Sequence, residues 1–192
     1  EEANQPMIFD DILLVFNGEI YNYKELIHLE QLECKTKSDS EVLIRLYQKY
    51  GFNFLNKLNG MFAFCIYDIK KELYFCARDR YGKKPFFYYF KNNKFIFSSS
   101  LKSILNLLDS KPNLNKVALC KYMQYFVPFG EDTFYQDVFK LEASTYMIYE
   151  PNKPQELQKK KYYKINTYKA IKDEKQALND IEELLVKSVE YR

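Results

Sequence analysis

The sequence has no tryptophan, one histidine, and only five glycines and six prolines in 192 residues. It also lacks a Cys-x-x-C pair and any Cys/His spacing typical of a zinc site, so the lone His28 gives no reason to expect a metal. The longest wholly apolar run, residues 61–67, is far shorter than the roughly 20 residues that span a bilayer, and no secretory signal opens the chain. We therefore expect a cytoplasmic protein.

The charges are nearly balanced, with 29 basic and 26 acidic residues and a net charge of +3, which argues against an obligate nucleic-acid binder. Hydrophobic residues make up 47% of the chain and aromatic residues 18%, enough for a packed core in one domain, or in one domain plus a fragment. The four cysteines lie among apolar neighbours, and we interpret them as buried, reduced core residues: Cys34, Cys65, Cys76 and Cys120.

The first third of the chain shows one strand pattern and two helix patterns. The predicted elements are a strand at 12–16, buried on both faces, and helices at 22–33 and 39–50. Asn22 with Glu25, and Ser38 with Glu41, have the spacing of capping boxes at the helix starts. Gly51 is the predicted end of the second helix.

The middle of the chain alternates with a period of two. The predicted strands are 61–68, 73–79, 86–90 and 94–98, which we expect to form an antiparallel meander covered by helices. Helices at 101–108 and 116–126 and a strand at 145–149 follow. The polar segment 151–161 reads as a linker, and an amphipathic helix begins at Asp173. These patterns predict a domain over 1–150, a linker over 151–172 and the start of a second domain over 173–192.

Asn17 and Gly18 stand where we expect the first strand to end. A glycine backbone N–H beside an asparagine amide offers two neutral donors, the groups that stabilise a developing oxyanion. Asn-Gly is also a common tight-turn dipeptide, and this motif alone favours the turn. The basic segment 78–84 also has two possible interpretations, a phosphate-binding turn or a structural turn. Asp79 partly neutralises its cations, which argues against phosphate binding. We interpret that segment as a structural turn at a strand end, without a ligand.

Glu19 and Asp39 are two carboxylates that together could hold the ammonium group of an amino acid. Taken singly, Glu19 reads as an exposed turn residue, and Asp39 as an acid in the first turn of a helix, where the helix dipole favours it. Only their combination favours the binding role.

Three segments together resemble one family in order and spacing. FNGEIYNYKEL, TKSDSEVLIRLYQKYG and LNGMFAFCIYDIKKELYFCARDRYGKKPFFYY are similar to the class II glutamine amidotransferase domain of glutamine-hydrolysing asparagine synthetases. The resemblance covers residues 6–192. It implies an α+β fold of the N-terminal-nucleophile hydrolase type, an αββα sandwich of antiparallel sheets that is incomplete at its N-terminus here. Residues 173–192 then resemble the first helix of the synthetase domain.

The resemblance also implies a function. Asn17 and Gly18 would form the oxyanion hole, and Asn17, Gly18, Glu19 and Asp39 would contact glutamine, with the carboxylates taking its α-ammonium. The family passes the released ammonia to a C-terminal domain that uses ATP and magnesium to convert aspartate to β-aspartyl-AMP and then to asparagine. The implied partners are glutamine, aspartate and ATP, with no nucleic acid and no membrane. A homodimer is kept as an option.

Several positions depart from the family pattern. The family nucleophile is an N-terminal cysteine whose own α-amine serves as base, whereas position 1 here is Glu1. The arginine stretch that precedes the family's first motif and the Ser-Gly-Gly-x-Asp-Ser loop that follows are also not found, so we expect a fragment truncated at both ends and inactive alone. Cys34 matches an apolar core position and is not a substitute nucleophile. Lys83 replaces a usual apolar residue, and Ser100 a usual glutamate.

Two other readings stay open. The domain could serve an acceptor other than aspartate, because class II domains also support amino-sugar and purine synthesis. It could also be a non-catalytic amidotransferase-like module.

Overall fold

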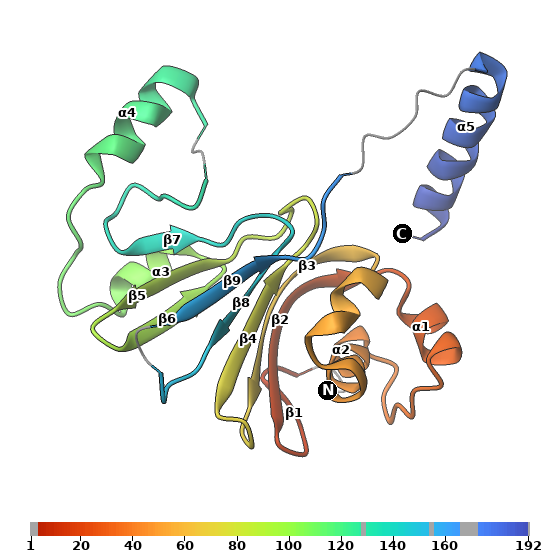
Figure 1. The fold of residues 1–192 in the computed structure, drawn as a ribbon, viewed down its shortest axis with the longest axis horizontal. Helices are drawn as coiled ribbons and strands as arrows, with labels where there is room; N and C mark the ends of the chain where they lie inside the picture. Colours follow the sequence, from red (N-terminus) through yellow and green to blue (C-terminus); the bar gives the residue numbers. More distant parts are fainter. Residues whose placement is uncertain (1–3, 128–129, 154–155, 166–172, 192) are drawn as a thin grey trace.

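The computed structural model describes residues 4–127, 130–153, 156–165 and 173–191 (Figure 1). The strands are β1 Met7–Phe9, β2 Ile12–Ile20, β3 Gly60–Asp68, β4 Leu73–Arg78, β5 Phe87–Lys91, β6 Lys94–Ser98, β7 Val138–Lys140, β8 Thr145–Tyr149 and β9 Leu157–Lys161. The helices are α1 Tyr23–Leu29, α2 Asp39–Tyr50, the 3₁₀ helix η1 Gly51–Lys57, α3 Leu101–Asn106, α4 Lys116–Tyr125 and α5 Glu174–Glu190.

The strands form two antiparallel sheets. The larger has the order β1-β2-β3-β4-β8-β9, and the smaller has the order β6-β5-β7. The expected four-strand meander is therefore wrong, because β4 pairs with β8 while β5 and β6 lie in the other sheet. The turn after β4 redirects the chain from one sheet to the other.

That turn is held by two buried side chains at the end of β4. The Asp79 carboxylate accepts hydrogen bonds from the backbone N–H groups of Tyr81, Lys83 and Lys84, each at 3.0 Å. The Arg78 guanidinium donates to backbone carbonyls, among them that of Leu141 at 2.7 Å. The basic segment is thus a structural turn, as predicted.

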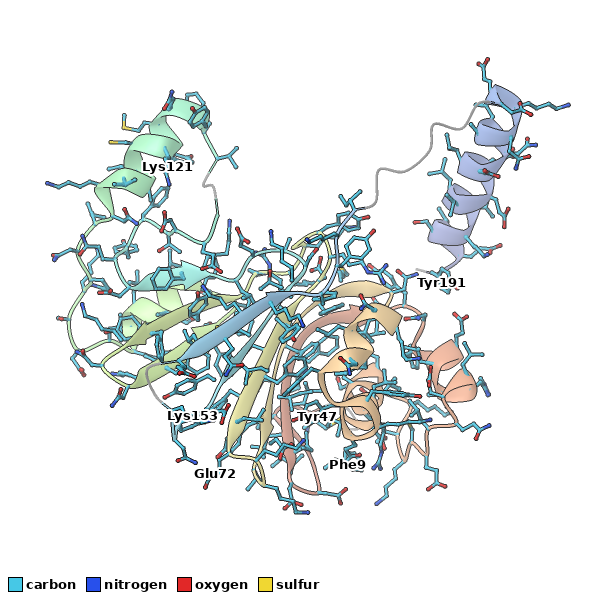
Figure 2. All side chains as sticks on the ribbon, viewed as in Figure 1. Phe9, Tyr47, Glu72, Lys121, Lys153 and Tyr191 are labelled. Atoms are coloured by element: carbon cyan, nitrogen blue, oxygen red, sulfur yellow. The ribbon has the colours of Figure 1, made fainter. Side chains whose placement is uncertain are left out.

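The layers pack together over two hydrophobic cores. One lies between the larger sheet and the helices α1, α2 and η1. Tyr47 of α2, labelled in Figure 2, packs there against the fully buried Phe75. The other fills the space between the two sheets and contains Cys65, Cys76 and Tyr88. Helix α3 contacts β5 and β6 of the smaller sheet. The order of layers is helix, sheet, sheet, helix.

Helix α2 begins and ends where the sequence predicts. Ser38 caps it by accepting a hydrogen bond from the Ser40 N–H at 3.2 Å, and Gly51 ends it with φ of 58°. Helix α1 is shorter than expected and its capping box does not form. The Asn22 side chain instead accepts from the Asn59 N–H at 2.9 Å and donates to the Lys57 carbonyl at 3.0 Å. It therefore fastens the start of α1 to the end of η1.

The segment expected to be a linker contains strand β9, which pairs with β8 along its whole length. Polar composition misled the prediction, because an edge strand has one open side that tolerates lysine. Helix α5 begins after Asp173 as predicted, and none of its described residues is buried. Its place as the first helix of a second domain stays a prediction. No helix in the described part of the chain has the length and apolar character that crossing a membrane requires.

The buried interpretation holds for two of the cysteines. Cys65 and Cys76 are buried opposite each other on β3 and β4, with 3.4 Å between their sulfur atoms. Cys34 is half-buried. Cys120 is exposed on α4, and its expected burial is wrong because this helix buries only Ala118.

Candidate functional site

Asn17, Gly18 and Glu19 lie inside strand β2, which continues past the predicted stop to Ile20. Gly18 is in register with Phe62 of β3, so Asn-Gly forms no turn here and the turn interpretation is wrong. The expectation that the strand is buried on both faces is also wrong, since Val15 is 44% exposed.

The close approach of β2 and β3 explains the glycine at position 18. Its φ is +155°, and a Cβ atom there would lie 2.1 Å from the Met61 carbonyl oxygen and 2.7 Å from the Phe62 Cα. Any side chain would therefore push the two strands apart.

The open edge of β2 is the central feature of the site. Strand β1 pairs with β2 only as far as Leu14, so the outer edge from Val15 to Ile20 has no neighbouring strand among the described residues. On this edge the Phe16 N–H donates to the Gln5 side chain at 2.7 Å, and the Ile20 N–H donates to Asp39 Oδ2 at 3.0 Å. Backbone N–H groups alternate sides along a strand. The N–H of Gly18, midway between Phe16 and Ile20, therefore points to the same open edge.

Asp39 is brought to this edge by helix α2. It is the first residue of the helix, and its bond to Ile20 fixes its carboxylate beside the end of β2. Burial raises the pKa of Asp39, the hydrogen bonds from the backbone of Ile20 and Ser40 oppose the rise, and the negative charge of Glu19 adds to it. A cation bound between the two carboxylates would relieve this repulsion.

Asn17 faces a cavity between the two sheets. The cavity has a volume of about 210 Å³ and is lined by Asn17, Ala63, Cys65, Phe86 and Phe97, among others. Among the described residues, the Asn17 carboxamide has no hydrogen-bond partner. Its amide donor is therefore free to meet a group that enters this cavity.

Glu19 is exposed and lines a second hollow of about 550 Å³ together with Tyr23, Lys24 and Tyr191. The structure thus gathers all four sequence-predicted residues at one end of β2. Asn17 and Glu19 lie on one face of the strand by its alternation, Gly18 presents its backbone at the edge, and Asp39 approaches from the helix layer.

Sequence reasoning missed two parts of this arrangement. The Ile20 N–H, which orients Asp39, carried no signal because it is a backbone group of an apolar residue. Glu41 was interpreted as a capping-box partner of Ser38, but its carboxylate instead accepts hydrogen bonds from Lys35 and Thr36, before the helix. The signal was present in the Ser38-x-x-Glu41 spacing, but the donor was assigned wrongly: the N–H groups of Lys35 and Thr36, and not that of Ser38, donate to Glu41.

The described residues contain no cluster of three or more His, Cys, Asp or Glu side chains that could hold a metal ion. The chemistry at this end of β2 is instead that of two neutral donors and two carboxylates. Such a set can bind a cationic amino acid head group and stabilise an oxyanion a few ångströms away.

Comparisons with known proteins agree with this geometry. A family model described as a glutamine amidotransferase domain matches residues 1–163. A putative glutamine-hydrolysing asparagine synthetase 2 of Methanocaldococcus jannaschii is 45% identical over 185 residues, which cover 95% of this chain and 36% of that protein. The glutamine-hydrolysing asparagine synthetase 1 of Bacillus subtilis is 34% identical over 197 residues, with 98% and 30% covered. The chain thus spans about a third of the length of these relatives.

A solved structure supports the fold. The glutamine phosphoribosylpyrophosphate amidotransferase of Bacillus subtilis, in complex with ADP and GMP, superposes with a TM-score of 0.55 at 17% identity, over 85% of this chain and 33% of that one. At this identity the likeness concerns architecture alone. The expected α+β fold of the N-terminal-nucleophile hydrolase type is confirmed.

Proposed function

The chain belongs to the glutamine amidotransferase family, and from that premise we propose that it binds glutamine at the end of β2 and releases ammonia from the glutamine side chain. The observation that carries the proposal is the open edge of β2. There the Gly18 N–H, which follows Asn17 in the chain, lies on the same edge as the Ile20 N–H that donates to Asp39.

Each of the four residues has a role in this proposal. Glu19 and Asp39 bind the α-ammonium of glutamine. Burial raises the pKa of Asp39 and the charge of Glu19 adds to the rise, and a bound ammonium group offsets the repulsion between the two carboxylates. The Gly18 N–H and the Asn17 side-chain amide donate hydrogen bonds to the carboxamide oxygen as it becomes an oxyanion. In other acyl-transfer enzymes, removing one such donor costs about 3–4 kcal/mol of transition-state stabilisation.

A thiolate is the nucleophile that the resemblance implies, and we assign that role to none of the four cysteines. Cys65 and Cys76 are buried against each other, and burial raises the pKa of Cys76 well above its ordinary value, which disfavours a thiolate. Cys120 lies on α4, on the far side of the smaller sheet from α2 (Figure 1). Cys34 packs at the margin of the core between the helices and the larger sheet.

For the complete protein we propose glutamine-dependent synthesis of asparagine, with ammonia attacking β-aspartyl-AMP made from aspartate and ATP with magnesium. The names of the relatives at 45% and 34% identity support this acceptor. The proposal gives the described residues no part in binding ATP or magnesium. The division into domains at residue 150 and a homodimeric assembly stay predictions.

The substitution Asp39→Asn in the complete gene product tests the role of the carboxylates. We expect the KM for glutamine to rise at least about tenfold, because a charged contact to the ammonium is lost. Synthesis with added ammonia should stay within about twofold of the wild type, since it bypasses glutamine.

Glu33→Gln is the matched control, because Glu33 is an exposed carboxylate in the loop before α2. It should leave both activities unchanged. Equal loss of the glutamine-dependent and ammonia-dependent activities in Asp39→Asn would contradict the assigned role.

Product analysis separates the open alternatives. Ammonia release from glutamine without asparagine formation from aspartate, ATP and magnesium would indicate another acceptor. No ammonia release by the complete gene product would favour a non-catalytic module.

A further inference from the structure

Glu41 carries a charge in the core at the start of α2. Its side chain is fully buried, and it lies two residues after Asp39. Its carboxylate accepts hydrogen bonds from the backbone N–H groups of Lys35 at 2.8 Å and Thr36 at 2.6 Å. The Thr36 hydroxyl donates to it at 2.8 Å, and the Arg45 guanidinium at 3.2 Å.

These bonds close the loop 35–38 onto the first turn of the helix that follows it. The Thr36 hydroxyl oxygen also accepts from the Ser38 N–H at 3.3 Å, and Ser38 in turn caps the helix by accepting from Ser40. The chain is therefore fixed immediately before Asp39 as well as after it. Burial alone would disfavour the charged form of Glu41, yet the hydrogen bonds from Lys35, Thr36 and Arg45 hold its pKa below the ordinary value of 4.5. The carboxylate stays ionised at neutral pH.

We propose that Glu41 is a positioning residue for the glutamine site, one that holds Asp39 at the end of β2 through the loop 35–38. Asp39 reaches β2 by a single hydrogen bond to the Ile20 N–H, so the direction of its carboxylate depends on where α2 begins. Glu41 fixes that beginning. This inference rests on the proposed binding of glutamine by Asp39.

The substitution Glu41→Gln keeps the size of the side chain and changes its hydrogen bonding. One carboxylate oxygen becomes an NH₂ group, which would face the donors of Lys35, Thr36 or Arg45. Two donors cannot bond each other, so the loop 35–38 is released and Asp39 shifts. A shift of about 1 Å in a positioning element can change activity by as much as a hundredfold, and a partial shift here should raise the KM for glutamine about tenfold.

The experiment compares two substrates on the complete gene product. Glutamine carries the α-ammonium, and glutaramate is the same molecule without its α-amino group. With Glu41→Gln we expect the kcat for glutamine to stay within about twofold while its KM rises. The kcat/KM for glutaramate should not change, because that substrate makes no contact with Asp39.

Asp68→Asn is the matched control for a purely structural effect. Asp68 is also a buried carboxylate tied to α2, but it accepts from the Tyr47 hydroxyl at 2.9 Å in the second half of the helix, away from Asp39. This variant should lose stability without any change in the ratio of the two kcat/KM values. Thr36→Val removes one hydrogen bond to Glu41 and serves if Glu41→Gln fails to fold. Thr36→Val should lower the kcat/KM for glutamine relative to that for glutaramate, by a smaller factor than Glu41→Gln does.

Three results would overturn the inference, and they distinguish its failure from that of the proposed function. A wild-type protein without glutaminase activity overturns the proposed function together with this inference. An active wild type whose Glu41→Gln and Thr36→Val variants keep the wild-type ratio overturns the inference alone. A parallel loss on both substrates does the same, because it shows that Glu41 acts only on stability.

Discussion

Gly18 lies where the backbones of β2 and β3 leave no room for a side chain, and its own backbone serves the proposed site as well as the sheet. A Cβ atom at this position meets the backbone of Met61 and Phe62 rather than flexible side chains, so the strain cannot be relieved by a rotamer change. The position of the Gly18 N–H at the open edge therefore requires a residue without a side chain.

Gly18→Ala should lower the free energy of unfolding by more than about 3 kcal/mol, because both the steric overlap and the backbone conformation are unfavourable. Gly51→Ala is the control. Gly51 also has a positive φ, but nothing lies within 4 Å of its added Cβ, so the cost should be about 1–2 kcal/mol. Urea unfolding of both variants measures the difference. Equal costs would show that the two strands do not approach as described.

Two buried carboxylates fix helix α2 to the rest of the molecule. Glu41 lies in its first turn, and Asp68 of β3 contacts its second half. Glu41 binds the preceding loop, and Asp68 of β3 binds Tyr47 and the N–H of Lys71. Burial disfavours the charge of Asp68, but the hydrogen bonds from Lys71 and Tyr47 outweigh it and lower its pKa below the ordinary 3.8. Ionised Asp68 therefore stabilises the folded state.

This sign predicts how stability depends on pH. A carboxyl group with a lowered pKa contributes its full stabilisation above its ordinary pKa, and the contribution is lost as the pH falls through the pKa of the folded state. Asp68→Asn should lower the free energy of unfolding at pH 7 by about 1–3 kcal/mol and make it depend less on pH below about pH 4.

Asp11→Asn is the control for this prediction. Asp11 pairs with Lys70 at the surface, where both side chains are exposed, so its loss should change stability by less than about 0.5 kcal/mol. Urea unfolding at several pH values measures both variants. An Asp68→Asn protein with the wild-type pH dependence would contradict the assignment.

The elements differ in how far the sequence predicted them. Helix α2 was predicted to the residue, because its signals at Ser38 and Gly51 are local. Strand β2 was stopped too early at Asn17, because its continuation depends on β3, which lies some forty residues further along the sequence. The candidate site was predicted as a set of residues through the resemblance. Its geometry at the open edge could not be, because it depends on how far β1 extends.

At the scale of the whole molecule, the two sheets meet over a core of small and aromatic side chains. The local sequence patterns predicted that β5 and β6 are strands but not which sheet they join. That depends on the turn held by Arg78 and Asp79, which leads the chain away from β4. Cys65 and Cys76 lie within this core, and Cys120 lies outside it.

The thiols should report on the opening of this core. In the native protein we expect Ellman's reagent to modify Cys120 rapidly and Cys65 and Cys76 only at the rate at which the sheets separate, because the pair is buried and the raised pKa of Cys76 keeps its thiol protonated. The Cys120→Ser variant removes the reaction of Cys120, so that among the four cysteines only the half-buried Cys34 is left to react ahead of the buried pair. If that variant still shows two rapidly reacting thiols, the packing between the sheets is not as described.

Strand β9 forms one border of the larger sheet, and it ends in three consecutive lysines, residues 159–161. A strand from another molecule that added here would have to dehydrate the ammonium group of Lys160 and disturb the ion pairs of Lys159 with Glu131 and of Lys161 with Glu142. The lysine-rich composition that led to the prediction of a linker thus disfavours the addition of further strands at this border of the sheet.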